Sequence, residues 1–166
     1  KEIKNHEYRV GLTPSSVFEL CKHGHRVMIE HDAGAGVDFS DEQYSACGAE
    51  VVDRAEDIFA RAEMIIKVKE PQPSECEMLR EGQILYTYLH LAPDPKQTAL
   101  LLASGATCVA YETITDAQGG LPLLAPMSEV AGRMSVQAGA NHLGKCNGGR
   151  GVLLAGVPGV APAKVL

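Results

Sequence analysis

Short hydrophobic runs alternate along this chain with segments that carry helix start and stop signals, and this alternation most constrains its fold. The runs at 26–30, 64–68, 84–88 and 107–111 have the length of strands, and Val51-Val52 suits only a brief extended piece. The sequence therefore predicts an α/β fold, a Rossmann-like or flavodoxin-like open parallel sheet with helices on both faces.

The expected helices begin at side chains that can accept a hydrogen bond from the exposed N–H groups of a first helical turn. The expected segments are 14–23 after Thr13, Ser40 to Gly48, 54–61 after Asp53, 95–103 after Asp94, and Ser128 to Lys145. Ser74 to Glu77 has the form of a capping box. Glycine and proline in 147–162 predict a loop, and Lys164-Val165-Leu166 predicts the start of a new strand.

Composition disfavours several classes of partner. The chain has 166 residues, with 15 Lys and Arg against 21 Asp and Glu, so its net charge of −6 disfavours nucleic acid or an anionic membrane. No apolar run approaches the eighteen or so residues of a membrane-spanning helix. The first residues lack the apolar segment of a secretory signal, and five cysteines without a C-x-x-C pair predict reduced thiols in a cytoplasmic protein. No histidine shows ligand spacing, so no metal is expected.

Polar side chains follow successive predicted strands. Lys69, His90 and Glu112 each come at the end of one strand, and Arg9 occupies the equivalent place in the first unit. Ligands of open parallel sheets bind at these carboxyl ends. A guanidinium recognises a carboxylate through two hydrogen bonds, an ammonium polarises a carbonyl, and an imidazole carries protons near neutral pH. The residues predict a site for a small oxo or amino acid, although Glu112 is equally compatible with a structural ion pair.

The other three residues also have structural alternatives. Arg9 could pair with Glu7, Lys69 could be a solvated strand end, and His90 could be a buried histidine with its hydrogen bonds satisfied. By strand alternation Lys67 and Lys69 would share a face, unless the chain turns after Lys69 and redirects it.

Glycine-rich stretches match nucleotide-binding loops only in part. Gly34-Ala35-Gly36 has the first two glycines of the dinucleotide fingerprint without the third, and it predicts a turn. The stretches 148–151 and 156–159 lack both this fingerprint and the lysine of a phosphate loop. No complete nucleotide fingerprint is present in the sequence.

Longer motifs are more specific. They are Lys1 to Pro14, Lys67 to Pro71, Thr87 to Pro93, Pro126 to Gly132 and Asn147 to Lys164. In these motifs, and almost continuously between them, the chain closely resembles the N-terminal part of the alanine dehydrogenase and pyridine nucleotide transhydrogenase family.

The resemblance implies an NAD-dependent enzyme that deaminates L-alanine oxidatively to pyruvate and ammonia and catalyses the reverse reaction. It implies that Arg9 holds the substrate carboxylate and that Lys69 contacts the carboxylate or the carbonyl oxygen. His90 would be the acid/base that assists attack of water on the imine and collapse of the carbinolamine. Ser128 would lie at a domain junction and contact the cofactor. A hexamer is also implied.

The resemblance further implies two domains. Residues 1–127 would form a substrate domain that lacks its C-terminal return. Residues 128–166 would form a linker helix, a Gly/Pro-rich loop and the first strand of an NAD-binding Rossmann domain. Since the glycine fingerprint is absent from the 166 residues, the chain alone is expected to be inactive.

Other functions remain open. One is the nucleotide-binding subunit of a proton-translocating transhydrogenase, which the resemblance implies would lack the Tyr-Leu-His segment around His90. Hydride exchange between two nicotinamides needs no proton-transfer residue, so His90 favours the amino-acid enzyme. Another is a non-catalytic module for keto-acid binding or oligomerisation. A saccharopine or lysine-forming dehydrogenase is less similar over Leu89 to Pro95.

Overall fold

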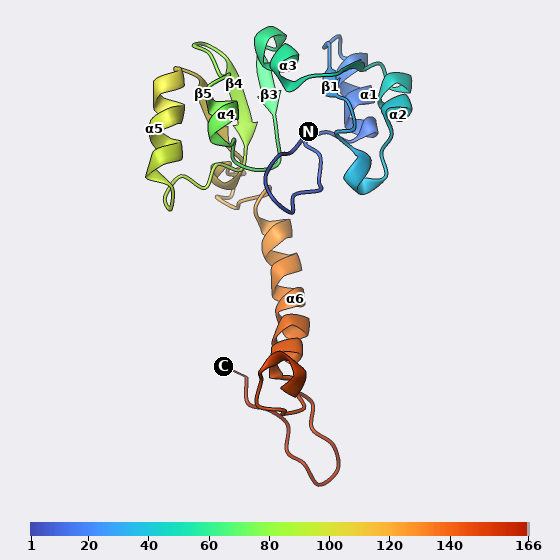
Figure 1. The fold of residues 1–166 in the computed structure, drawn as a ribbon, viewed down its shortest axis with the longest axis vertical. Coiled ribbons are helices and arrows are strands. Elements are labelled where there is room, and N and C mark those ends of the chain that lie inside the picture. Colours follow the sequence, from blue (N-terminus) through green and yellow to red (C-terminus); the bar gives the residue numbers. More distant parts are fainter. Residues whose placement is uncertain (166) are drawn as a thin grey trace. The chain divides into compact units, whose positions relative to one another are not determined.

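The computed structural model describes residues 1–165, and the chain divides into two compact units, Lys1–Thr113 and Ile114–Leu166. The first unit contains all five strands of the described residues, each paired in parallel, together with helices α1 to α5 (Figure 1). The parallel α/β class that the alternating pattern predicts is therefore confirmed.

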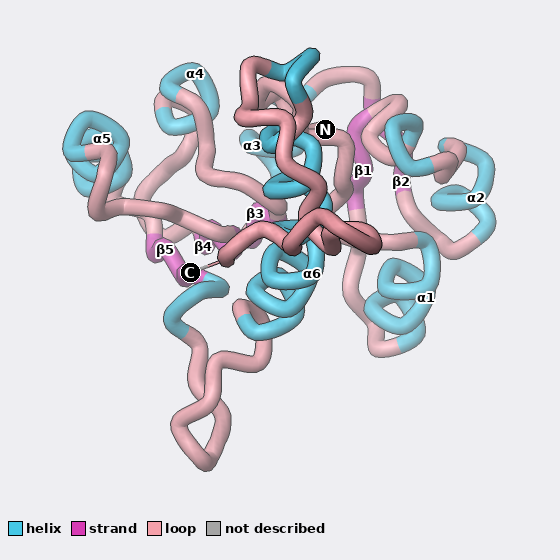
Figure 2. Tube along the Cα trace, turned by 90° about the horizontal axis from the view of Figure 1, so that it is seen from below, coloured by secondary structure: helices cyan, strands magenta, loops and turns pink. Residues whose placement is uncertain are grey.

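One group of elements in the first unit surrounds a two-stranded sheet. Strands β1 (Met28–Glu30) and β2 (Glu50–Val52) pair in parallel, and helices α1 (Pro14–Lys22) and α2 (Asp41–Ala46) lie beside them (Figure 2). Their apolar side chains form a small core of Val17, Ile29, Ala33 and Tyr44.

A second group surrounds a three-stranded sheet. Strands β3 (Met64–Ile66), β4 (Ile84–Thr87) and β5 (Thr107–Ala110) are hydrogen-bonded in that order. Helices α4 (Pro73–Cys76) and α5 (Pro95–Ser104) follow β3 and β4 along the chain and contact each other. The core of this group is Phe59, Ile65, Cys76, Leu79, Leu85, Leu89 and Leu101.

Among the described residues, no strand of the first sheet is paired with a strand of the second. Helix α3 (Ala55–Arg61) contacts β1 and β2, yet its Phe59 belongs to the core of the three-stranded sheet. A cavity of about 1140 Å³ extends from β1 to β3 and is also lined by α3 and by residues 10–12. The strands thus form two parallel sheets rather than one continuous sheet.

Three expected helix caps are confirmed. The side chain of Thr13 accepts a hydrogen bond from the Ser16 N–H, and the side chain of Asp94 accepts one from the Gln97 N–H. Ser40 forms a capping box with Gln43 at the start of α2. These short-range contacts satisfy N–H groups that have no partner inside a helix.

Two other expected caps are wrong. Helix α3 has Arg54 rather than Asp53 at its N-cap, with no side-chain hydrogen bond there. Helix α4 begins with Pro73, so its capping box pairs Gln72 with Glu75 instead of Ser74 with Glu77. Proline is favoured in a first turn because its missing N–H would have no partner there, which explains the earlier start.

The second unit contains one long helix, α6 (Ala125–Leu143), and a short 3₁₀ turn, η3 (Lys145–Asn147). Ser128 was expected to cap this helix but lies inside it, since Pro126 is accommodated in the first turn. The expected loop over 147–162 is irregular apart from its overlap with η3 and a bridge between Val157 and Val160. A strand was expected to begin at Lys164, but Lys164 and Val165 are not in a strand, and Leu166 lies outside the described residues.

Among the described helices, none is both long and apolar enough to cross a membrane.

Candidate functional site

Arg9 lies in the segment before α1 and is paired with Glu7, as the structural alternative anticipated. The Glu7 carboxylate accepts hydrogen bonds from Arg9 Nε at 2.8 Å, from Arg9 Nη2 at 2.7 Å and from the Arg9 backbone N–H at 2.9 Å. These bonds raise the pKa of Arg9 and lower that of Glu7. The Glu7 side chain is 9% exposed and that of Arg9 is 49% exposed. In residues 1–165 Nη1 has no partner, so the guanidinium can still receive a second carboxylate.

Lys69 lies near Arg9 in the loop after β3. Its side chain is 23% exposed, and its Nζ is 3.9 Å from Glu70 Oε2. Burial lowers the pKa of Lys69 most, the cations of Lys4 and Arg9 lower it further, and carboxylates oppose the shift. Two cations thus share one electrostatic environment, which suits an anionic ligand.

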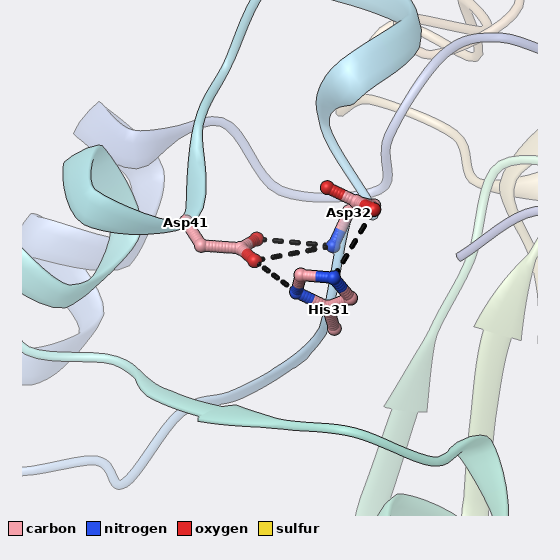
Figure 3. Close-up of side chains that lie close together, drawn as sticks. All are labelled: His31, Asp32 and Asp41. Carbon is pink, nitrogen blue, oxygen red and sulfur yellow. Dashed lines mark hydrogen bonds and ion pairs between the residues drawn. The ribbon is translucent and has the colours of Figure 1, made fainter.

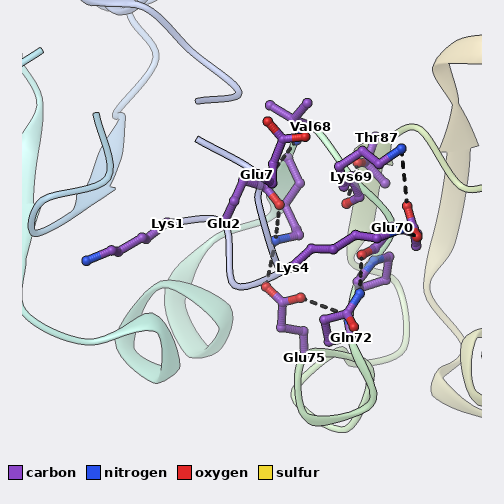
Figure 4. Close-up of polar contacts among 12 residues, drawn as sticks. Lys1, Glu2, Lys4, Glu7, Val68, Lys69, Glu70, Gln72, Glu75 and Thr87 are labelled. Carbon is purple, nitrogen blue, oxygen red and sulfur yellow. Dashed lines mark hydrogen bonds and ion pairs between the residues drawn. The ribbon is translucent and has the colours of Figure 1, made fainter. Parts of the chain in front are cut away.

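Lys67, by contrast, is committed to a buried ion-pair cluster. Its Nζ donates to Glu75 Oε1 at 2.6 Å and to Glu2 Oε2 at 3.1 Å, and its side chain is 7% exposed. Glu2 also accepts a hydrogen bond from the Val68 N–H at 2.6 Å (Figure 4). Strand β3 ends at Ile66, so strand alternation does not extend to Lys69, and the two lysines have different partners.

His90 follows β4 and is exposed, so the alternative of a buried, satisfied histidine is wrong. Its φ of 49° is left-handed, which is uncommon for a residue other than glycine. Glu112 Oε1 accepts hydrogen bonds from the backbone N–H groups of His90 at 2.8 Å and Leu89 at 3.0 Å. Within the described chain the His90 ring itself makes no hydrogen bond or ion pair, which leaves it available for a ligand.

Tyr88, which the sequence patterns did not single out, lies near Arg9 just after β4. Its ring packs edge-to-face on Tyr111, with centroids 4.8 Å apart, and Tyr86 packs on the same ring at 4.2 Å. Burial raises the pKa of Tyr88, and the nearby Arg9 cation opposes this shift. A period of two over the expected strand 84–88 would place Tyr86 and Tyr88 on one face, which could have identified the pair, although β4 itself ends at Thr87.

The first two glycines of the partial fingerprint serve packing. Residues Ala35–Val37 form a 3₁₀ turn, η1, as the turn prediction implied. A Cβ on Gly34 would lie 2.7 Å from Phe39 Cβ, and one on Gly36 would lie 2.9 Å from the Tyr8 carbonyl oxygen. Close approach of neighbouring chain therefore explains both glycines.

The described residues do not fit a pyridine dinucleotide by themselves. None of the strand-to-helix connections within 1–165 carries the three-glycine turn that accommodates a pyrophosphate. Ser128, the residue expected to contact a cofactor, is exposed on α6 and donates a 3.5 Å hydrogen bond to the Leu124 carbonyl. Residues 1–165 therefore offer no complete nucleotide site.

A separate surface cluster brings together His31, Asp32 and Asp41 (Figure 3). The Nδ1 atom of His31 is 2.5 Å from Asp41 Oδ2, and Nε2 is 3.2 Å from Asp32 Oδ2. Both ring nitrogens thus lie beside carboxylates, and the Asp41 hydrogen bond raises the pKa of His31 most. The geometry is that of a surface ion-pair cluster.

The segments after β3 and β4 therefore carry a partly desolvated ammonium and an exposed imidazole, whereas the guanidinium of Arg9 lies in the segment before α1, which no described strand precedes. Neither the 1140 Å³ cavity nor a second cavity of about 320 Å³ is lined by Arg9, Lys69 or His90. On a parallel α/β fold, these side chains have the chemistry to bind a small carboxylate and to exchange protons with it.

Family comparison agrees with this class. Residues 1–131 match the family described as alanine dehydrogenase/PNT, N-terminal domain, and residues 135–166 match the corresponding C-terminal domain. The chain belongs to the alanine dehydrogenase/PNT family, whose members are pyridine-nucleotide-dependent oxidoreductases.

Several relatives are named alanine dehydrogenase. The chain is 59% identical to that of Halomonas elongata and 56% identical to that of Mycolicibacterium smegmatis, each over 99% of this chain. It spans 44% of the length of both relatives.

Solved structures give the same family relationship. An L-alanine dehydrogenase structure superposes with a TM-score of 0.85 at 53% identity, over 98% of this chain and 45% of that chain. A transhydrogenase from Sinorhizobium meliloti superposes with a TM-score of 0.65 at 29% identity, over 69% of this chain and 34% of that chain.

Proposed function

We propose that this chain carries the substrate-binding half of an NAD-dependent alanine dehydrogenase. The reaction converts L-alanine, water and NAD⁺ to pyruvate, ammonium, NADH and a proton, and it is reversible. The observation that carries the proposal is the pair of neighbouring cations, Arg9 and Lys69, together with the exposed His90, whose backbone N–H is bound by Glu112, a carboxylate that also acts on Lys69.

In this proposal Arg9 and Lys69 bind the substrate. The open Nη1 of Arg9 donates to the carboxylate, while Glu7 holds the opposite edge of the guanidinium. Lys69 supplies a second positive charge to the carboxylate or to the carbonyl oxygen, where an ammonium favours developing negative charge. Partial burial removes water from this ammonium, and this loss of solvation is the main cause that lowers the pKa of Lys69.

His90 is the proposed acid/base. Deamination requires a proton to leave the water that attacks the imine carbon, and a proton to reach the nitrogen that departs as ammonia. An imidazole can perform both transfers near neutral pH. The His90 ring has no hydrogen-bond partner in residues 1–165 that would compete with these transfers.

NAD is the proposed cofactor, and it supplies the hydride acceptor when bound. Ser128 is the one described residue proposed to contact it, on the resemblance alone. A cytoplasmic location and a hexameric assembly are proposed on the same basis.

The nucleotide-binding subunit of a transhydrogenase is a second candidate, because the Sinorhizobium meliloti structure shares the fold at 29% identity. His90 distinguishes the two candidates, since proton transfer is needed for deamination and not for hydride exchange. A non-catalytic keto-acid-binding module is the third.

Calorimetric titration of the 166-residue chain with pyruvate tests the binding half of the proposal. We expect wild-type chain to bind and Arg9→Lys to bind about 10-fold or more weakly, because lysine cannot reproduce a planar fork of donors. Lys22→Met, which removes a cation from the exposed end of α1, is the matched control and should bind like wild type. Equal affinity of Arg9→Lys and wild type would contradict the role of Arg9.

Turnover is tested in a chimera that joins this chain to the remainder of the Halomonas elongata alanine dehydrogenase. We expect the chimera to oxidise NADH with pyruvate and ammonia, and His90→Ala to lower kcat by roughly 10²–10⁴-fold while NAD binding is retained. Near-normal turnover of His90→Ala would rule out the acid/base role. Turnover by the 166-residue chain alone would contradict the assignment of the nucleotide site to residues outside it.

A further inference from the structure

We infer that Glu112 is a positioning residue that fixes the backbone conformation of His90, a role that rests on the proposed function. Glu112 lies in the 3₁₀ turn η2 (Tyr111–Thr113), directly after β5, whereas His90 follows the neighbouring strand β4. Its side chain therefore joins the carboxyl ends of two adjacent parallel strands.

The contacts of Glu112 are directed at the backbone of the loop that carries His90. Oε1 accepts from the N–H groups of His90 at 2.8 Å and Leu89 at 3.0 Å, and Oε2 lies 3.2 Å from the Leu89 nitrogen. Two successive N–H groups that converge on one anion form a backbone nest. The N–H groups of Leu89 and His90, which lie just beyond the end of β4, thus have a carboxylate oxygen as their acceptor.

The peptide between Leu89 and His90 is held from both sides. Its N–H donates to Glu112, and its carbonyl oxygen accepts a 2.9 Å hydrogen bond from Nε2 of the buried Gln97. The Leu89 side chain is buried in the core of the three-stranded sheet. The plane of this peptide is consequently clamped between α5 and η2.

This clamp explains how His90 keeps a left-handed φ of 49°. Such a conformation is disfavoured for a side chain with a Cβ and persists only when surrounding contacts determine it. Because φ of His90 sets the direction of its Cα–Cβ bond, the clamp also sets where the imidazole is presented. Glu112 acts on the reaction through His90 and not by contact with the reacting atoms.

Two variants separate positioning from charge. In Glu112→Gln the amide oxygen can replace Oε1 and accept from both N–H groups, although the negative charge is lost. In Glu112→Ala both the acceptor and the charge are lost. A positioning role predicts that glutamine rescues and alanine does not, whereas an electrostatic role toward Lys69 predicts that both variants fail alike.

Amide hydrogen exchange of the 166-residue chain measures whether Glu112 protects the Leu89 and His90 amides, and it does not depend on enzyme turnover. We expect the Leu89 and His90 amides to exchange about 10-fold or more faster in Glu112→Ala and near the wild-type rate in Glu112→Gln. The amide of Leu85, in the middle of β4, is the internal control for global unfolding. Unchanged protection of Leu89 and His90 in Glu112→Ala would overturn the inference.

Kinetics in the chimera test the consequence for the reaction. We expect Glu112→Ala to lower kcat by about 10- to 100-fold with the KM for pyruvate nearly unchanged, and Glu112→Gln to retain most of kcat. An equal loss in both variants would overturn positioning in favour of charge. If the wild-type chimera itself does not turn over, the proposed function fails, and the exchange rates still decide whether Glu112 holds His90.

Discussion

Single side chains in this protein differ chiefly in whether their hydrogen-bonding groups are already occupied. Arg9 uses one edge of its guanidinium on Glu7 and keeps Nη1 open, whereas Lys67 directs its ammonium at two buried carboxylates. The His90 backbone is tied to Glu112, while its ring has no partner in residues 1–165. Partial occupation of this kind orients a group and leaves it able to bind a ligand.

A pH-dependent interaction is expected at His31. Because its pKa is raised in the folded chain, chiefly by Asp41, protonated His31 stabilises the fold. This contribution is complete below the unfolded pKa of about 6.5 and is lost as the pH rises through the raised value. We expect Asp41→Asn to lower the pKa of His31 in an NMR titration and to flatten the pH dependence of unfolding.

The control for this titration is Asp38→Asn, which removes a carboxylate that makes no contact with His31 among the described residues. It should leave the pKa of His31 close to the wild-type value. The same His31 pKa in wild type and in Asp41→Asn would contradict the assignment.

At the scale of elements, β3 and the loop that follows it show how tertiary contacts end a strand. The hydrophobic run predicts a strand over 64–68, yet β3 ends at Ile66. The Val68 N–H donates to Glu2 rather than to a neighbouring strand, and Lys67 pairs with Glu2 and Glu75. The N-terminal segment is thereby attached to β3 and α4, while the Lys67 N–H and the Val68 carbonyl still bond to Tyr86 and Tyr88 beyond the end of β3.

Removal of Lys67 tests this attachment. Lys67→Met leaves the buried carboxylates of Glu2 and Glu75 without their cation, so we expect it to lower the free energy of unfolding by about 3–5 kcal/mol. Lys69→Met, two residues away, should change it by less than about 1 kcal/mol, because within residues 1–165 the Lys69 ammonium has only a long contact with Glu70. Urea unfolding of both variants measures the difference, and similar losses would refute the distinction.

At the scale of the whole molecule, the first unit has two hydrophobic cores. Ile29 belongs to the core around β1 and β2, and Leu85 belongs to the core around β3 to β5. The two cores share no buried residue, and a cavity of about 1140 Å³ lies between β1 and β3.

Separate cores predict additive effects on stability. Leu85→Ala should cost roughly 2–5 kcal/mol and Ile29→Val about 0.5–1.5 kcal/mol. Since the two side chains share no core neighbours, the double variant should cost the sum within about 0.5 kcal/mol. Denaturant unfolding of the two single variants and the double variant measures the coupling, and a coupling energy above about 1 kcal/mol would show that the cores act as one.

Local sequence patterns were enough to predict the parallel α/β class, most helix positions, and the placement of Lys69, His90 and Glu112 at strand ends. These features follow from periodicity and capping, which act over a few residues, and from the rule that parallel strands end at one edge. The same local signals misplaced the caps of α3, α4 and α6 where proline or backbone geometry favoured another start.

The partner of each polar group, by contrast, depends on the folded chain. Folding joins Lys67 to Glu2 across 65 residues of sequence, and Glu112 to the His90 amide across 22. It also divides the strands into two sheets with a cavity between them. Such contacts depend on burial and on the meeting of distant segments, where an unpaired polar group is costly, and no local pattern of residues encodes that choice.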